Sequence, residues 1–192
     1  MKEVIIKELE ESAAVKKAVA GQMTEKIADA AEKVIASYRA GGKVLLIGNG
    51  GSAADAQHIA TELIGRLGKE RKALPAIALT TDSSILTALA NDYGYETVFS
   101  RQVEALANDN DILIAISTSG TSPNIIKAIE TAHHIGIAVI ALTGESGGIV
   151  RDKADISIEV PSANTQRIQE AHITIGHIIC RIVEDEFFRN IK

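Results

Sequence analysis

Short apolar runs alternate with helical patterns along most of this 192-residue chain, and this alternation restricts its possible folds more than any other feature. The runs are largely apolar throughout rather than alternating with polar residues. Each therefore predicts a strand that is buried on both faces of a parallel sheet. Five strands are predicted, at residues 44–47, 76–79, 112–116, 138–142 and 156–160.

Apolar residues at helical spacing fill the segments between these strands. They predict helices at 53–66, 84–91, 98–106 and 124–135, and a short helix after Gly148. Two helices precede the first strand, at about 4–19 and 24–40, and one long helix ends the chain at 165–189. Thr24 is predicted to be the N-cap of the second helix, and Gly41-Gly42 to end it.

The predicted fold class is α/β, a three-layer α/β/α sandwich with a five-stranded parallel sheet of the flavodoxin-like kind. Helices are added to it at the N-terminus and the C-terminus. We expect a single domain over residues 1–192, with an N-terminal helical extension at 1–40 and a C-terminal helix at 165–189.

Composition excludes several classes of function. Aromatic residues are only 3% of the chain, Trp is absent and the net charge is −5, so nucleic acid is not an expected partner. No apolar run approaches the roughly 20 residues that span a bilayer, and the N-terminus lacks a signal-peptide core, so no membrane association is expected. The single cysteine, Cys180, fits a reducing compartment, and we expect a cytoplasmic protein.

The C-terminal helix is apolar around nearly its whole circumference, which indicates burial on most sides. It could pack under the N-terminal helices of the same chain, or form a helical bundle between subunits. The second alternative predicts an oligomer. The apolar residues of this helix are Ile168, Ala171, Ile173, Ile175, Ile178, Ile179, Ile182 and Val183.

A glycine-rich loop, residues 48–52 (Gly-Asn-Gly-Gly-Ser), separates the first strand from a helix. Such a loop exposes backbone N–H groups where the helix dipole is positive, and these groups bind phosphate or a sugar hydroxyl. His58 and Glu62 lie four residues apart in that helix and share one face. Alone, such a pair is usually a surface pair, but its place beside the loop predicts chemistry on a phosphorylated metabolite.

A serine-rich loop, residues 117–124 (Ser-Thr-Ser-Gly-Thr-Ser-Pro-Asn), follows the third strand and precedes another helix. Its hydroxyls and free N–H groups at the end of a strand predict a phosphate cradle. The alternative is an ordinary turn in which Ser122 or Asn124 caps the helix. Two such loops in a fold whose ligands collect at the C-terminal ends of strands favour binding.

Other polar residues stay ambiguous from spacing alone. Gln169 and His177 are eight residues apart in the C-terminal helix, about 80° apart in projection, and could converge on one site. His172 is a rival candidate, and periodicity does not choose between them. Asn91-Asp92 would by default only end a helix.

Together these motifs resemble the phosphoheptose isomerases of the sugar isomerase (SIS) domain family, over essentially the whole chain. The resemblance implies a cytoplasmic homotetramer that commonly binds zinc and converts D-sedoheptulose 7-phosphate to D-glycero-D-manno-heptose 7-phosphate through an enediol. This is the first step of bacterial heptose biosynthesis for lipopolysaccharide or related glycans. The motifs that carry it are Asn49-Gly50-Gly51-Ser52, His58, Glu62, Asn91-Asp92, Ser117-Thr118-Ser119, Ser122 and Arg167-Ile168-Gln169-Glu170 with His177.

The resemblance also implies roles for single residues. Glu62 would be the general base and His177 its acid partner. Zinc would be held by His58, Glu62, Gln169 and His177, although Glu62 cannot be a fully committed ligand and a free base at once. The sugar phosphate would be bound by Asn49, Gly50, Gly51, Ser52, Glu62, Asn91, Asp92, Ser117, Thr118, Ser119, Ser122 and Gln169.

Two alternatives remain at this point. Some SIS proteins of nearly this length are noncatalytic and assist the replication initiator DnaA, and in those the positions of Glu62 and His177 do not carry acid/base residues. The presence of both residues here favours the enzyme. The second alternative is a SIS isomerase that acts on another sugar phosphate, because the walls of the pocket set the length of the substrate.

Overall fold

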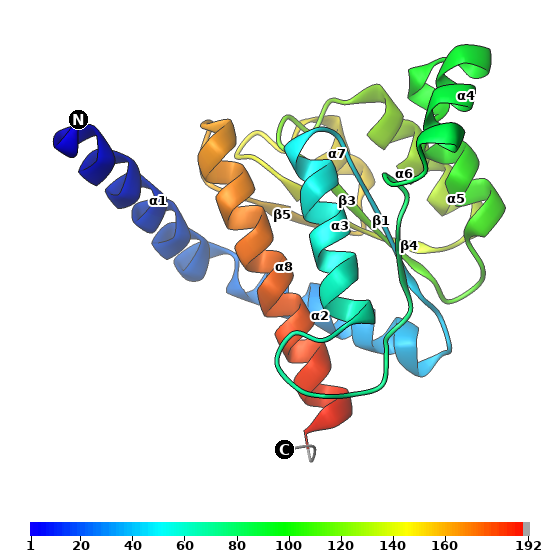
Figure 1. Ribbon diagram of the computed structural model, residues 1–192, viewed down its shortest axis with the longest axis horizontal. Coiled ribbons are helices and arrows are strands. Elements are labelled where there is room, and N and C mark those ends of the chain that lie inside the picture. The colour runs from blue at the N-terminus through cyan, green and yellow to red at the C-terminus, as the bar shows by residue number, and fades with distance from the viewer. Residues whose placement is uncertain (190–192) are drawn as a thin grey trace.

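The computed structural model describes residues 1–189 and has the predicted three-layer α/β/α architecture (Figure 1). All strands of the sheet are parallel, and their order β2-β1-β3-β4-β5 is the flavodoxin-like one. All five predicted strands are confirmed, with ends that move by at most one residue. They are β1 (Val44–Gly48), β2 (Ala76–Ala78), β3 (Ile112–Ser117), β4 (Ala138–Thr143) and β5 (Ile156–Glu159).

Each predicted helix is also present, and only the segment after the second strand divides differently. There, η1 (Tyr95–Thr97), a short 3₁₀-helix, precedes α5 (Ser100–Leu106), so the predicted helix at 98–106 begins two residues late. The other helices are α1 (Lys2–Gln22), α2 (Thr24–Arg39), α3 (Gly51–Ile64), α4 (Ser83–Tyr93), α6 (Pro123–Ile135), α7 (Gly148–Lys153) and α8 (Thr165–Phe188). Within residues 1–189, no helix combines the length and apolar character that crossing a membrane requires.

The prediction that Thr24 caps α2 is wrong. Met23 is the N-cap, and Thr24 is the first helical residue. Only Met23 separates α1 from α2, so the Thr24 hydroxyl lies over the last turn of α1 and donates a hydrogen bond to the Ala20 carbonyl at 2.7 Å. The hydroxyl therefore hydrogen-bonds a carbonyl at the end of α1, and the N–H groups at the start of α2 receive no side-chain cap.

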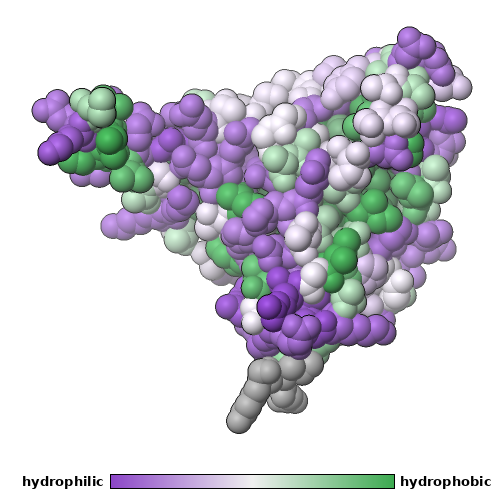
Figure 2. Space-filling view, viewed as in Figure 1, coloured by the Kyte–Doolittle hydropathy of each residue, from purple (hydrophilic) through white to green (hydrophobic). Residues whose placement is uncertain are grey.

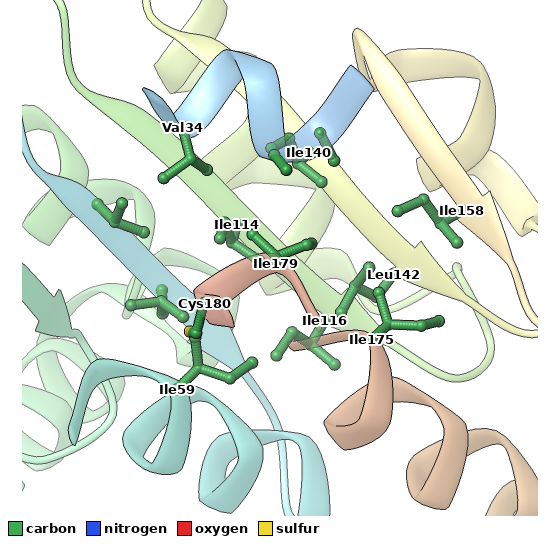
Figure 3. Close-up of a cluster of buried hydrophobic side chains, with 14 of the residues drawn as sticks. Val34, Ile59, Ile114, Ile116, Ile140, Leu142, Ile158, Ile175, Ile179 and Cys180 are labelled. Atoms are coloured by element: carbon green, nitrogen blue, oxygen red, sulfur yellow. The ribbon is translucent and has the colours of Figure 1, made fainter. Parts of the chain in front are cut away.

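Each face of the sheet has its own apolar core. Side chains of α2, α3 and α8 cover one face, where they meet strand residues such as Leu46, Ile114 and Leu142. Side chains of α5, α6 and α7 cover the other, where they meet alternate residues such as Leu45 and Leu113. In Figure 3, Ile175 and Ile179 of α8 lie among Ile59 of α3 and the isoleucines of the sheet. Successive strand residues point to opposite faces, so continuous apolar runs supply both cores.

Helices α3 and α8 lie side by side over the sheet (Figure 1), and Gly176 of α8 lies against Ile59 of α3. A Cβ atom on Gly176 would lie only 2.6 Å from Cδ1 of Ile59. Any side chain at position 176 would therefore require Ile59 to shift. His177 and His58 are the direct neighbours of these two residues in the sequence.

The structure decides between His172 and the pair Gln169 and His177, because His172 is fully buried on the side of α8 that faces the sheet. Its Nε2 lies 3.0 Å from the carbonyl oxygen of Thr143, the last residue of β4, so Nε2 carries the hydrogen. Burial lowers the pKa of His172 from its ordinary 6.5 to about 4, against the opposing effect of this hydrogen bond. His172 is thus a neutral core residue.

Because His172 is buried in its neutral form, the free energy of unfolding depends on pH. In the unfolded chain His172 is protonated below pH 6.5, whereas in the folded chain it is protonated only below about pH 4. The free energy of unfolding should therefore fall as the pH decreases through this range, by about 3 kcal/mol at pH 4 from this residue. Urea unfolding of the wild type and of His172→Gln from pH 7 to pH 4 measures the difference.

The variant should lose less stability on acidification than the wild type. His134→Gln, which replaces an exposed histidine of α6, is the matched control and should keep the wild-type pH dependence. Equal pH dependence in the wild type and His172→Gln would contradict the assignment.

Candidate active site

Three side chains from two helices converge at the surface between α3 and α8. His58 and Glu62 come from α3, and His177 comes from α8. The Nε2 atoms of the two histidines are 2.9 Å apart, and Oε1 of Glu62 lies 3.2 Å from Nε2 of His58. We call His58, Glu62 and His177 the triad. That His58 and Glu62 belong to a functional site, rather than to a solvated surface pair, stays a prediction, and the convergence adds His177 to the pair.

The triad has the donor set and spacing of a metal site. One donor atom from each of its three residues lies within 4.8 Å of the other two. Zinc binds imidazole nitrogen and carboxylate oxygen at about 2.0–2.2 Å, so two ligands of one tetrahedral ion lie about 3.3 Å apart. The separations of 2.9 and 3.2 Å are close to this value. The residues present therefore fit a divalent cation of the size of zinc.

The glycine-rich loop lies at the end of β1, directly before α3. Gly50 has a φ of +55°, and a Cβ on Gly48 would lie 2.5 Å from the backbone of Ser52, so the turn depends on both glycines. The side chain of Ser52 is buried in the first turn of α3. A Cβ on Gly51 would lie 2.5 Å from Nε2 of Gln169, so the Gln169 amide lies directly against this loop.

The serine-rich loop begins beside it, because Gly48 of β1 pairs with Ile116 of β3 in the sheet. Oγ of the buried Ser117 accepts a hydrogen bond from the Gly120 N–H at 3.2 Å. The exposed Ser119 accepts hydrogen bonds from Thr121. Ser122 is the N-cap of α6, but its side chain makes no capping hydrogen bond. The Ser119 and Ser122 hydroxyls therefore lie near a helix N-terminus, where an anion is favoured.

A pair of amides, the buried Asn124 and the half-buried Asn49, joins the two loops. Nδ2 of Asn49 donates to Oδ1 of Asn124 at 2.9 Å, and Nδ2 of Asn124 donates back to Oδ1 of Asn49 at 2.8 Å. The Tyr95 hydroxyl also donates to Oδ1 of Asn49, at 3.2 Å. Asn124 further accepts from the Ile125 N–H, which is the local bonding typical of a residue in the first turn of a helix.

Sequence reasoning missed the roles of Asn124 and Tyr95. Asn124 was weighed only as a helix cap, and Tyr95 carried no signal, because neither residue's spacing reveals a partner in another loop. Asn49, predicted to bind the sugar, makes these hydrogen bonds to protein groups in the structure.

Asn91 and Asp92 lie in the last turn of α4 rather than after its end, because the helix continues to Tyr93. Both are exposed, and Nδ2 of Asn91 donates to Oδ1 of Asp92 at 2.8 Å. Their default interpretation as a helix end was therefore wrong by about one residue. Gly94, with a φ of +90°, ends the helix instead.

Comparison with known proteins agrees with this geometry. The SIS domain family model matches residues 9–144. A phosphoheptose isomerase of Aquifex aeolicus is 55% identical over 96% of this chain and 97% of its own length. Two solved phosphoheptose isomerase structures, each 43% identical, have the same fold. The Neisseria gonorrhoeae structure has a TM-score of 0.91 and covers 96% of this chain and 98% of its own. The Francisella tularensis structure has a TM-score of 0.92 and covers 95% of this chain and 97% of its own.

The parallel sheet, the two loops at its edge and the family match define a sugar isomerase (SIS) domain protein. Within this class, the chain belongs to the phosphoheptose isomerase family. The resemblance stated from the motifs is thereby confirmed, and the chain is a sugar-phosphate isomerase.

Proposed function

We propose that this protein converts D-sedoheptulose 7-phosphate to D-glycero-D-manno-heptose 7-phosphate, the first step of heptose biosynthesis for lipopolysaccharide or related bacterial glycans. The observation that carries the proposal is the convergence of Glu62 and His177 between α3 and α8, on a chain of this family. A carboxylate and an imidazole are the groups that an aldose–ketose isomerisation requires.

The two loops supply the proposed binding groups for the sugar phosphate. The phosphate contacts Ser117, Thr118, Ser119 and Ser122, with Ser52 nearby. The hydroxyls of the sugar contact Gly50, Gly51 and the pair Asn91 and Asp92, and Gln169 contacts the substrate from α8. Asn49 contributes to this set and also holds the two loops together through Asn124.

The reaction follows from the chemistry of Glu62 and His177. Glu62 removes a proton from C1 of the ketose, the C1–C2 double bond forms, and the C2 oxygen takes a proton from His177. The enediol then gives the proton of its C1 hydroxyl to His177, which restores the acid, as Glu62 returns a proton to C2, and the aldose forms. Oε1 of Glu62 faces His58, which leaves Oε2 for proton transfer. One oxygen of the Glu62 carboxylate can thus bind the cation while the other accepts the proton, so Glu62 can serve as both ligand and base.

We propose zinc as the cation, held by His58, Glu62 and His177. Gln169, whose amide lies against Gly51 at the start of α3, is proposed as the fourth ligand. When bound, the ion supplies positive charge that stabilises the enediolate oxygen.

The two alternatives differ from the proposal in single features. A noncatalytic SIS protein that binds DnaA would not need Glu62 and His177 within reach of one cation, as they are here. An isomerase of another sugar phosphate would use the same groups, so only a comparison of substrates separates it. Incubation of the pure protein with sedoheptulose 7-phosphate, followed by NMR, detects the aldose phosphate directly.

Replacing the proposed base tests the mechanism. Glu62→Gln keeps the size of the side chain but removes the group that accepts the proton. We expect turnover to fall about 10²–10⁴-fold with the fold intact, measured by the same NMR assay and by circular dichroism. Glu104→Gln, which breaks an exposed ion pair with Arg101 on α5, is the control and should keep wild-type turnover. Near-normal turnover of Glu62→Gln would refute the assigned role.

Removing the cation tests the metal site. Elemental analysis of protein purified without chelator should find zinc, because three donors already converge at the triad. Activity should fall after treatment with a chelator and return when zinc is added. His58→Gln should bind zinc more weakly than the wild type. Protein that is fully active without any bound metal would show that the triad is a hydrogen-bonded group only.

We also propose that the protein is a cytoplasmic homotetramer built on its helices. Helix α1 projects from the body of the molecule (Figure 1), and apolar residues gather on its projecting end (Figure 2). An apolar hollow of about 300 Å³ lies between α1, α2 and α8. The exposed apolar side chains near these features include Val4, Ile5, Leu9, Ile178 and Ile182. A surface of this kind is typical of a subunit interface.

The mass of the protein in solution tests this assembly. Light scattering should give four times the 20.3 kDa of one chain. Ile182→Glu places a charge in the apolar hollow of α8 and should reduce the mass, because burying that charge is costly. Ile149→Glu, at an exposed position of α7, is the control and should leave the mass unchanged. A wild-type monomer would contradict the proposal.

A further inference from the structure

A buried ion pair joins the end of α3 to α8 and has no part in the proposed reaction. The side chains of Arg71 and Glu184 are each only 1% exposed, and Nε of Arg71 donates to Oε1 of Glu184 at 2.9 Å. Arg71 lies in the segment that follows α3, and Glu184 lies near the end of α8. The guanidinium group of Arg71 also lies over the ring of Phe188, 5.6 Å from its centre.

Arg71 binds the end of the helix that carries two members of the triad. Its two terminal nitrogens donate to the carbonyl oxygens of Glu62 and Leu63, each at 2.7 Å. These carbonyls lie in the last turn of α3, where the helix offers them no partner. Arg71 thus holds the backbone of Glu62 itself.

Glu184 binds the segment that leads to Arg71. Its carboxylate accepts hydrogen bonds from the N–H groups of Leu67, Gly68 and Lys69 at 2.9–3.2 Å. Burial alone would raise the pKa of Glu184, but the hydrogen bonds from Arg71 and from this backbone outweigh burial and lower it. The carboxylate therefore stays charged inside the protein.

The position of this pair along α8 matters for the triad. Glu184 lies seven residues after His177, which is two helical turns, so both side chains project from the same face of α8. Gly176, beside His177, leaves room for the Ile59 side chain of α3. Ile59 and Leu63 of α3 also line one small apolar space with Ile179 and Cys180 of α8. Apolar packing of this kind is non-directional, whereas the hydrogen bonds of Arg71 and Glu184 fix the end of α3 relative to α8.

We propose that Arg71 and Glu184 are positioning residues, which hold α3 and α8 at the angle that brings the three donors of the triad together. A buried ion pair is often no more stabilising than apolar residues of the same size, so its geometric role is the stronger reason for its presence here. This inference rests on the proposed metal site and isomerase reaction.

Variants that avoid a lone buried charge test the inference. Arg71→Met combined with Glu184→Gln removes both charges, while the Gln oxygen still accepts from the backbone. Arg71→Lys keeps the positive charge, but its single ammonium group lacks the planar array of donors that lets Arg71 bind Glu184 and both carbonyl oxygens at once. Asp185→Asn is the matched control, because it breaks the 2.9 Å ion pair with Lys69 between the same segment and the same helix without contact to α3.

Three measurements are made below the unfolding temperature of every variant. Circular dichroism establishes that the chain is folded. Competition with a chromophoric chelator gives the dissociation constant of the metal-free protein for Zn²⁺ and Co²⁺. The NMR assay gives kcat and KM for sedoheptulose 7-phosphate. A residue that only adds stability would leave the last two measurements unchanged in folded protein.

We expect both Arg71 variants to bind the cation about tenfold more weakly or worse, as for other groups that orient metal ligands. Their kcat should fall while KM stays near the wild-type value, because the loops that bind the phosphate are not disturbed. Asp185→Asn should behave as the wild type. A folded double variant with wild-type cation affinity and wild-type kcat would overturn the inference.

The same measurements on the wild type show whether the proposed metal site or the proposed substrate is wrong, separately from the role of Arg71 and Glu184. If the wild type binds neither cation, the metal site is wrong, and kcat alone then decides whether Arg71 and Glu184 position Glu62 and His177. If the wild type binds zinc but leaves sedoheptulose 7-phosphate unchanged, the substrate is wrong, and cation affinity decides the inference.

Discussion

A parallel sheet whose strands are apolar throughout must be covered on both faces, and this requirement decides where the other elements lie. Leu45 and Leu46, neighbours in β1, point into different cores, so neither face can be left to water. Helices α2, α3 and α8 cover one face, and α5, α6 and α7 the other. Because all the strands are parallel, their C-terminal ends lie at the same edge, and the loops after the paired strands β1 and β3 are adjacent.

The site depends on a second constraint, the close packing of α3 against α8. His58 and Glu62 share a face of α3 because they are four residues apart, but a third donor must come from elsewhere in the chain. Gly176 allows α8 to approach Ile59 closely enough for His177 to reach His58. The Arg71–Glu184 pair holds the same two helices together further along. The three donors thus meet through packing between helices, while the glycine-rich and serine-rich loops depend on the edge of the sheet.

The sequence predicted the fold well because its signals are local. Continuous apolar runs indicated the strands, and apolar residues at helical spacing indicated the helices between them. The pairing of His58 with Glu62 was also local. The choice between His172 and His177 was not, because both lie on the apolar α8 and only the docking of that helix shows which one faces the sheet. The Asn49–Asn124 amide pair and the Arg71–Glu184 ion pair join segments far apart in sequence, so no spacing could predict them.

The place of α8 at the end of the described chain has a consequence for biosynthesis. His58 leaves the ribosome 119 residues before His177, so the nascent chain carries only two of the three donors while its sheet is already complete. Until α8 docks, Ile114, Ile116 and Leu142 lack the cover that Ile175 and Ile179 later provide (Figure 3). Docking of this one helix closes the apolar core and completes the triad in the same step. A cation that binds only the docked form would stabilise it by mass action, so docking of α8 and binding of that cation would be thermodynamically linked.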